Sequence, residues 1–220
     1  FLKDFRLIRF MDWGQTNNSP QTTWASRSKY SDVTWAYGAG IPIEVMIALS
    51  NQVNCDMWLC IPHEADDNWV TQAARLVRYR LNPDLVCYVE VSNEVWNIFE
   101  QGGYFRTQGR ALWPTATGEQ DLIVQMSYYG YRSKQCFDLW DAEFAGVLSR
   151  RRRVFGAQTD FDAVNEATLD APVWRDYGTG YTAPHLSGDH MAVTTYYGYD
   201  LLQDAGRRAA IAAAYPATSD

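Results

Sequence analysis

Segments typical of strands alternate with segments typical of helices along this chain, and this alternation restricts its fold more than any other feature. Short apolar runs rich in β-branched and aromatic residues predict five strands, over residues 5–13, 55–62, 85–91, 153–158 and 190–197. Apolar residues at helical spacing predict helices over residues 43–51, 68–81, 121–149, 163–169 and 201–214. Because strands that alternate with helices build a parallel sheet, we predict a single α/β domain over residues 1–220.

Polar and aromatic side chains gather where all five predicted strands end. These side chains are Arg9, Trp13, His63, Asn93, Glu94, Gln158 and Tyr196. A doubly wound sheet concentrates its site at one switch point, whereas a (β/α)8 barrel brings residues from many strand ends to one face. No glycine-rich phosphate loop marks a strand–helix turn, which argues against nucleotide binding. We therefore expect a (β/α)8 TIM barrel, with five of its eight strands in this chain.

The most informative strand end is Asn93-Glu94, which follows the apolar run 85–91. A carboxyl group is costly to bury unless something uses it, so Glu94 is the first candidate for a catalytic residue. The alternative is that Glu94 enters the first turn of the next helix, where the helix dipole favours a carboxylate. The sequence alone leaves both interpretations open.

Charge and hydropathy exclude two classes of partner. The net charge of −7 argues against nucleic acid or an anionic membrane as a partner, and no stretch is long and apolar enough to span a bilayer. The one basic run, residues 150–153, is expected to be a solvated helix end. No signal peptide is recognisable, and the chain opens on structured-looking sequence, so we expect that a natural N-terminus has been removed.

Cysteine and histidine spacing predicts neither a metal nor a cofactor. Four cysteines and three histidines show no metal-ligand spacing, and no serine lies in a Gly-x-Ser-x-Gly context. Most of the cysteines are expected to be buried free thiols, with a Cys55–Cys60 disulfide as the alternative. Residues 14–30 are predicted to be a functional loop and residues 97–119 to be irregular, while Asp67 is expected to cap the helix over residues 68–81.

Three motifs extend these observations to a resemblance. They are Gly40–Glu44 (GIPIE), Pro62–Asp67 (PHEADD) and Tyr88–Asn97 (YVEVSNEVWN). Over nearly its whole length the chain resembles clan-A glycoside hydrolases, and more narrowly cellulase-like proteins of environmental bacteria. The resemblance implies a (β/α)8 barrel whose second to sixth strands lie in this chain. It also implies a secreted, endo-acting enzyme, which cleaves internal bonds of a β-linked polysaccharide by a retaining mechanism.

The resemblance also implies roles for individual residues. Glu94 would be the general acid/base, and Asn93 would hydrogen-bond the 2-hydroxyl of the sugar. Arg9 would support the nucleophile and His63 would line the cleft. Tyr196 would take the place of an aromatic contact from the sixth strand. Flat apolar platforms for sugar rings would come from Trp13, Trp96 and Tyr197.

The chain departs from the clan at the nucleophile, a Glu at the end of strand seven. Strands one, seven and eight are expected to lie outside this chain, and a chain truly this short is expected to self-associate through its open edges. A retaining mechanism needs a second carboxyl group about 5 to 5.5 Å from the first. The substitutes in this chain are better explained as helix caps or turn formers; they are Glu64, Asp66, Asp67 and Asp160.

Two alternatives to hydrolysis remain open at this point. The first is a carbohydrate-binding barrel that keeps the cleft but lacks the nucleophile, and so binds oligosaccharides without turnover. The second is an unrelated (β/α)8 enzyme in which Glu94 and His63 transfer protons next to a carbonyl group.

Overall fold

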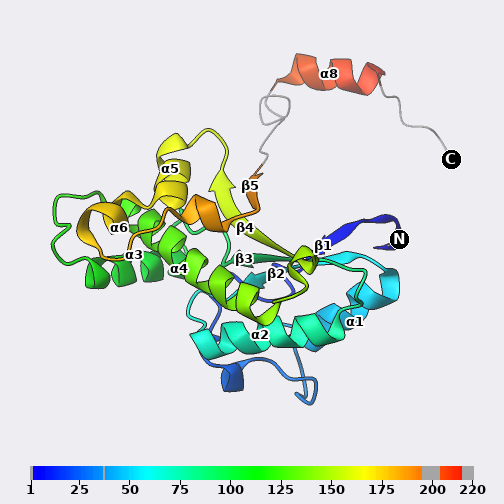
Figure 1. Cartoon of the computed structure of the whole chain (residues 1–220). Helices are drawn as coiled ribbons and strands as arrows, with labels where there is room; N and C mark the ends of the chain where they lie inside the picture. The colour runs from blue at the N-terminus through cyan, green and yellow to red at the C-terminus, as the bar shows by residue number, and fades with distance from the viewer. Residues whose placement is uncertain (1, 37, 195–203, 215–220) are drawn as a thin grey trace.

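Five parallel strands in sequence order form the sheet at the centre of the molecule (Figure 1). A computed structural model describes residues 2–36, 38–194 and 204–214. The strands are β1 (Leu7–Arg9), β2 (Asp56–Ile61), β3 (Cys87–Val91), β4 (Arg151–Gln158) and β5 (His190–Thr194). Every neighbouring pair is parallel, and the sheet curls into a half-barrel. The predicted alternation of strands and helices is therefore confirmed.

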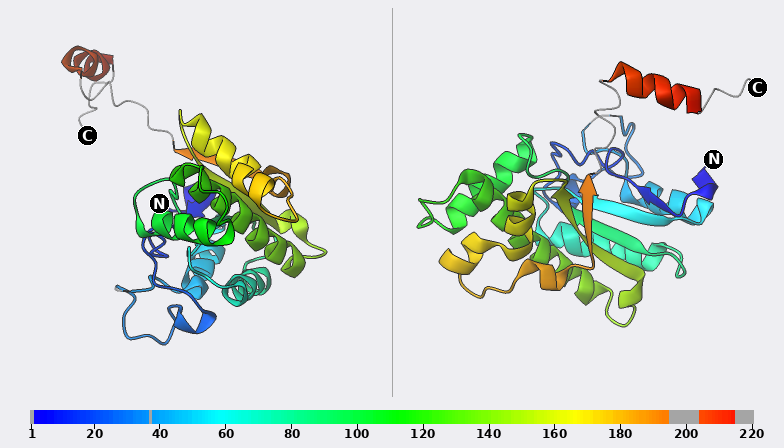
Figure 2. Two further views of the ribbon diagram at one scale, coloured as in Figure 1. Left: turned by 90° about the vertical axis from the view of Figure 1, so that its left-hand side faces the viewer. Right: turned by 90° about the horizontal axis from the view of Figure 1, so that it is seen from above.

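Helices lie between consecutive strands, and α8 (Ala205–Ala214) follows β5. Those between strands are α1 (Ile43–Val53), α2 (Asp67–Arg80), α3 (Glu100–Leu112), α4 (Asp121–Glu143), α5 (Asp162–Asp170) and α6 (Pro172–Tyr177). Short 3-10 turns are η1 (Leu2–Asp4), η2 (Trp24–Ser26), η3 (Leu148–Arg150) and η4 (Pro184–Ser187). Helix α8 stands apart from the other elements in both further views (Figure 2). Within the described ranges, none of these helices has the length and apolar character needed to cross a membrane.

The core lies between the sheet and helices α1, α2 and α4 (Figure 1). Successive side chains of a strand point to opposite faces. On β2 the residues Met57, Leu59 and Ile61 therefore pack into this core, as does Val89 on β3. The intervening residues of each strand face the other way, onto what we call the concave face of the sheet. This face carries Trp58 and Tyr88, which are paired in register and stack at 5.9 Å between ring centroids, together with Glu90 and Gly156.

Several boundaries and one connection differ from the prediction, most clearly those of β1, α4 and α3. Strand β1 is shorter than the predicted strand, and α4 ends at Glu143 rather than at residue 149. Residues 100–112 form helix α3, although the segment 97–119 was expected to be irregular. Apolar residues at helical spacing do not predict this helix, because its buried positions are Gln101, Gly102, Phe105 and Gly109. Only one of these is a large apolar residue.

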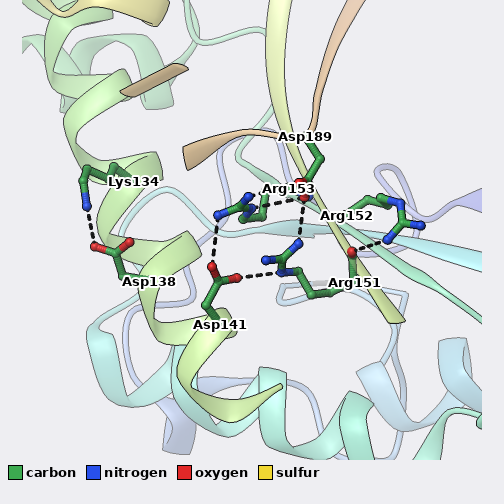
Figure 3. Close-up of polar contacts among 7 residues, drawn as sticks. All are labelled: Lys134, Asp138, Asp141, Arg151, Arg152, Arg153 and Asp189. Carbon is green, nitrogen blue, oxygen red and sulfur yellow. Dashed lines mark hydrogen bonds and ion pairs between the residues drawn. The ribbon is translucent and has the colours of Figure 1, made fainter. Parts of the chain in front are cut away.

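The basic run is not a solvated helix end, contrary to expectation. Arg151 and Arg153 lie on β4, and only 7% of Arg151 is exposed. Both arginines form ion pairs at 2.6–3.0 Å with Asp141 of α4 and with Asp189, the residue before β5 (Figure 3). These two carboxylates come from distant parts of the chain, so their partnership with the basic run is not visible in local sequence.

Two smaller expectations are also resolved. Asp66, not Asp67, caps α2: its side chain accepts a hydrogen bond from Trp69 N at 2.6 Å. Asp67 is instead the first residue of the helix and forms an ion pair with Arg132. All four cysteines are buried free thiols, so the Cys55–Cys60 disulfide is not formed.

Candidate functional site

A cleft of about 390 Å³ lies on the concave face, and each of the five strands contributes to its lining. The strand residues are Arg9, Trp58, Glu90, Gly156, Ala192 and Val193. Residues that follow the strands complete it: Met11, Asn17, Asn93, Glu94 and Trp96. Of the predicted site residues, the structure therefore brings four together: Arg9, Asn93, Glu94 and Trp96.

Asn93 and Glu94 sit in a tight turn at the end of β3. The φ angles of Ser92 and Glu94 are 61° and 43°, in the left-handed region that side chains other than glycine rarely adopt. Such conformations cost of the order of 1–3 kcal/mol each and concentrate at functional sites. The Glu94 carboxylate accepts a hydrogen bond from Asn97 Nδ2 at 2.9 Å. Because α3 begins only at Glu100, Glu94 is not in the first turn of a helix, and that alternative is excluded.

Side chains of helices α3 and α4 form hydrogen bonds to the backbone of this turn. Gln101, which is fully buried, donates from Nε2 to the main-chain oxygen of Asn93 at 3.0 Å, and Gln125 donates to the main-chain oxygen of Val95. Gly102 lets α3 approach closely, since a Cβ at that position would lie 2.2 Å from the main-chain oxygen of Asn97. The turn that carries Asn93 and Glu94 is therefore supported through its backbone.

Glu90 is a buried carboxylate on the floor of the cleft, with only 2% of the residue exposed. Its Oε2 atom accepts hydrogen bonds from Arg9 Nε at 3.2 Å, Arg9 Nη2 at 2.7 Å and Trp58 Nε1 at 2.9 Å. The Cys60 thiol adds a longer contact at 3.6 Å. Burial raises the pKa of Glu90, and the attraction of Arg9 opposes that rise.

The predicted functional loop also reaches the site. Asn17 lines the cleft, and its Oδ1 atom accepts from Asn93 Nδ2 at 3.0 Å and from Gln101 Nε2 at 2.7 Å. The Oδ1 atom of Asn93 in turn accepts from Arg9 Nη2 at 3.0 Å. A continuous chain of hydrogen bonds thus runs from Glu90 through Arg9 and Asn93 to Asn17 and Gln101.

Two further predicted site residues, Trp13 and His63, do not line this cleft. Trp13 is 43% exposed and packs on Phe10 instead. His63 is buried beneath Tyr104, so the prediction that it lines the cleft is wrong for the cleft that holds Glu94. The interpretation that pairs Glu94 with His63 for proton transfer loses its support. Tyr196 and Tyr197 lie outside the described residues.

The four substitute carboxylates do not line the cleft either. Glu64, Asp66 and Asp67 border a separate groove together with Tyr104 and Arg132. Asp160, at a φ of 57°, forms a turn after β4. Across the parts of the chain that the structure describes, no cluster of three or more His, Cys, Asp or Glu side chains could hold a metal ion.

Seven residues that line the cleft were not predicted from the sequence, and three of them carry polar or aromatic side chains: Asn17, Trp58 and Glu90. Glu90 had a signal, because a charged residue between apolar neighbours of a buried strand requires a partner. Trp58 lies in a predicted strand but gave no sign of which face it occupies. Asn17 is one of several amides in a polar loop, and only the folded structure shows that it is the one that lines the cleft.

Comparisons with known proteins do not assign this chain to a family. No family model, no curated protein and no solved structure matches it. The chemistry of the cleft must therefore be argued from the geometry of its own residues.

Acidification is expected to destabilise the protein through His63. Burial lowers the pKa of this imidazole, and the charge of Glu100 only partly offsets that effect. Below about pH 6.5 the unfolded chain takes up a proton on this ring before the native protein does, so the free energy of unfolding falls as the pH drops. His63→Phe should therefore lose less stability than the wild type between about pH 7.5 and pH 5.5 in urea denaturation.

The exposed His185 provides a matched control for this experiment. His185→Gln, measured in the same way, shows how far the loss of any histidine ring changes the result. An unchanged pH dependence in His63→Phe would show that the buried ring does not resist protonation.

Proposed function

We propose that this chain carries the acid/base part of an endo-acting glycoside hydrolase that cleaves a β-linked polysaccharide. In this proposal β1–β5 are strands two to six of a (β/α)8 barrel. The observation that carries the proposal is that Glu94 shares one cleft with Asn93 and Trp96. A carboxyl group can transfer the proton, an amide can bind a hydroxyl group, and flat aromatic faces can stack on sugar rings.

Glu94 is the proton donor in this proposal. In the first step its carboxyl group gives a proton to the glycosidic oxygen as the bond to the leaving sugar breaks and a separate nucleophilic carboxylate bonds to the anomeric carbon. In the second step the Glu94 carboxylate takes a proton from the water that attacks the anomeric carbon, breaks the bond to the nucleophile and releases the product. Asn93 and Trp96 position the sugar for both steps. Because Arg9 and Glu90 neutralise each other, the cleft suits an uncharged glycan better than an acidic one.

Glu90 does not serve as the nucleophile in this scheme. Its Oε2 atom is already occupied by donors from Arg9, Trp58 and Cys60, and only 2% of the residue is exposed. The retaining mechanism therefore takes its nucleophile, a Glu, from outside the residues that line the described cleft. No cofactor or metal takes part.

The same observation favours one alternative, which is oligosaccharide binding without turnover. Glu90 and Glu94 are the two carboxylates that line the described cleft, and Arg9 pairs with Glu90. The described lining therefore does not supply the second carboxyl group that a retaining mechanism needs. In that case the cleft would bind sugars, but the protein would release no products.

Reducing-end release from soluble β-glucans and β-mannans tests the proposal. Wild-type protein should hydrolyse at least one glycan of the panel, and Glu94→Gln should not. If neither protein releases reducing ends but both bind the matching oligosaccharide, the binding alternative replaces hydrolysis. If neither activity nor binding is found, both proposals fail.

A further inference from the structure

The ion pair of Glu90 and Arg9 connects the floor of the cleft to the side chain of Asn93. One guanidinium nitrogen, Arg9 Nη2, lies 2.7 Å from Glu90 Oε2 and 3.0 Å from Asn93 Oδ1. The guanidinium also lies over the ring of Trp58, with 5.1 Å from Cζ to the ring centroid. The carboxylate and the ring together leave Arg9 little freedom to turn away from Asn93.

The charge of Arg9 determines which way the Asn93 amide points. A guanidinium has N–H donors and no acceptor, so the Asn93 atom that faces it must be the carbonyl oxygen. The NH2 group then lies on the other side, where one N–H donates to Asn17 Oδ1 at 3.0 Å. Within the described ranges, no residue accepts the second N–H of Asn93 in a hydrogen bond.

We infer that Glu90 is a positioning residue: through Arg9, it fixes the Asn93 amide so that an N–H donor is available to a ligand in the cleft. The ligand atom that meets Asn93 must then be an acceptor, such as the oxygen of a sugar hydroxyl. The sugar as ligand rests on the proposed function, whereas the orientation of the amide does not.

The negative charge of Glu90 is essential to this arrangement. Donors from Arg9, Trp58 and Cys60 converge on one oxygen, Oε2. A neutral amide oxygen is a weaker acceptor, and the NH2 group of a glutamine would add two further donors to a place already crowded with them. Glu90→Gln should therefore release Arg9, and with it the Asn93 amide.

The test begins with NMR of the ligand-free protein, so that it does not depend on sugar binding. The side-chain NH2 signals of Asn93 are assigned by their loss in Asn93→Asp. In the wild type the N–H bonded to Asn17 should exchange slowly with water. In Glu90→Gln it should exchange faster, and the signal pair should move toward the positions of a solvated amide. Unchanged signals and exchange would overturn the inference.

Binding of cellohexaose and mannohexaose provides the second readout. Glu90→Gln should weaken the affinity for the better ligand about tenfold, which corresponds to the loss of about one hydrogen bond. In the Asn93→Ala background the same substitution should have little further effect, because Glu90 acts through Asn93. Additive losses would mean that Glu90 only supports the fold, and would overturn the inference.

Matched variants keep the test decisive. Glu44→Gln breaks another partly buried pair, Arg27–Glu44 at 2.7 Å, whose residues do not line the cleft; it should leave the Asn93 signals and the binding unchanged. If Glu90→Gln does not fold, Arg9→Gln/Glu90→Gln replaces it, since removing both charges leaves none unpaired. Absence of sugar binding by the wild type would contradict the proposed function, while the NMR result would still decide the role of Glu90.

Discussion

Glu94→Gln is expected to reduce hydrolysis of the preferred glycan by about 10²- to 10⁴-fold, the usual contribution of a general acid/base. Glutamine keeps the shape of the side chain, and its amide oxygen can still accept the hydrogen bond from Asn97 Nδ2. It cannot give a proton to the glycosidic oxygen. The loss should therefore appear in kcat, with oligosaccharide binding nearly unchanged.

Two controls separate the loss of the acid from a general disturbance. Glu64→Gln changes an exposed carboxylate that also follows a strand but borders a different groove, and it should leave hydrolysis unchanged. An aryl glycoside with a very acidic phenol as leaving group needs little protonation, so Glu94→Gln should affect its cleavage much less. Equal losses on both kinds of substrate would argue against Glu94 as the acid.

Gly130→Ala is expected to destabilise the protein by about 1–3 kcal/mol, the usual range for overpacking. Gly130 lies in α4, where a Cβ would come within 2.2 Å of the main-chain oxygen of Thr168 in α5. Backbone cannot move aside as a flexible side chain can, so α4 and α5 would have to separate. Urea denaturation monitored by tryptophan fluorescence measures the loss.

Gly103→Ala is the matched control, because it makes the same change in a helix where a Cβ would meet nothing within 4 Å. Alanine is the better helix former, by up to about 1 kcal/mol, so this variant should be as stable as the wild type or more stable. If Gly130→Ala were also neutral or stabilising, this result would contradict the close approach of α4 and α5 at Gly130.

The strands and the cleft could be predicted because both depend on local sequence. Apolar runs marked β2, β3 and β4, and a parallel sheet necessarily brings their carboxyl ends to one edge. Asn93, Glu94 and Arg9 were therefore expected to lie near one another, and all three line the same cleft.

What could not be predicted depends on partners far away in the sequence. Helix α3 buries Gln101 and two glycines because of what faces them, so it lacks an apolar pattern. The local sequence predicts that Arg151 is exposed, whereas in the folded protein it forms ion pairs with Asp141 and Asp189. The position of Trp58 beneath Arg9 likewise appears only when β1 and β2 are paired.

Calorimetric titration of Glu94→Gln with cellohexaose and mannohexaose tests the central claim most directly, namely that the cleft beside Glu94 is a glycan site. The substitution prevents turnover, so that binding alone is measured. We predict saturable binding of at least one of the two sugars, and its loss when Trp96→Ala is added. Absence of binding, or binding that Trp96→Ala leaves unchanged, would contradict the assignment of this cleft to a glycan.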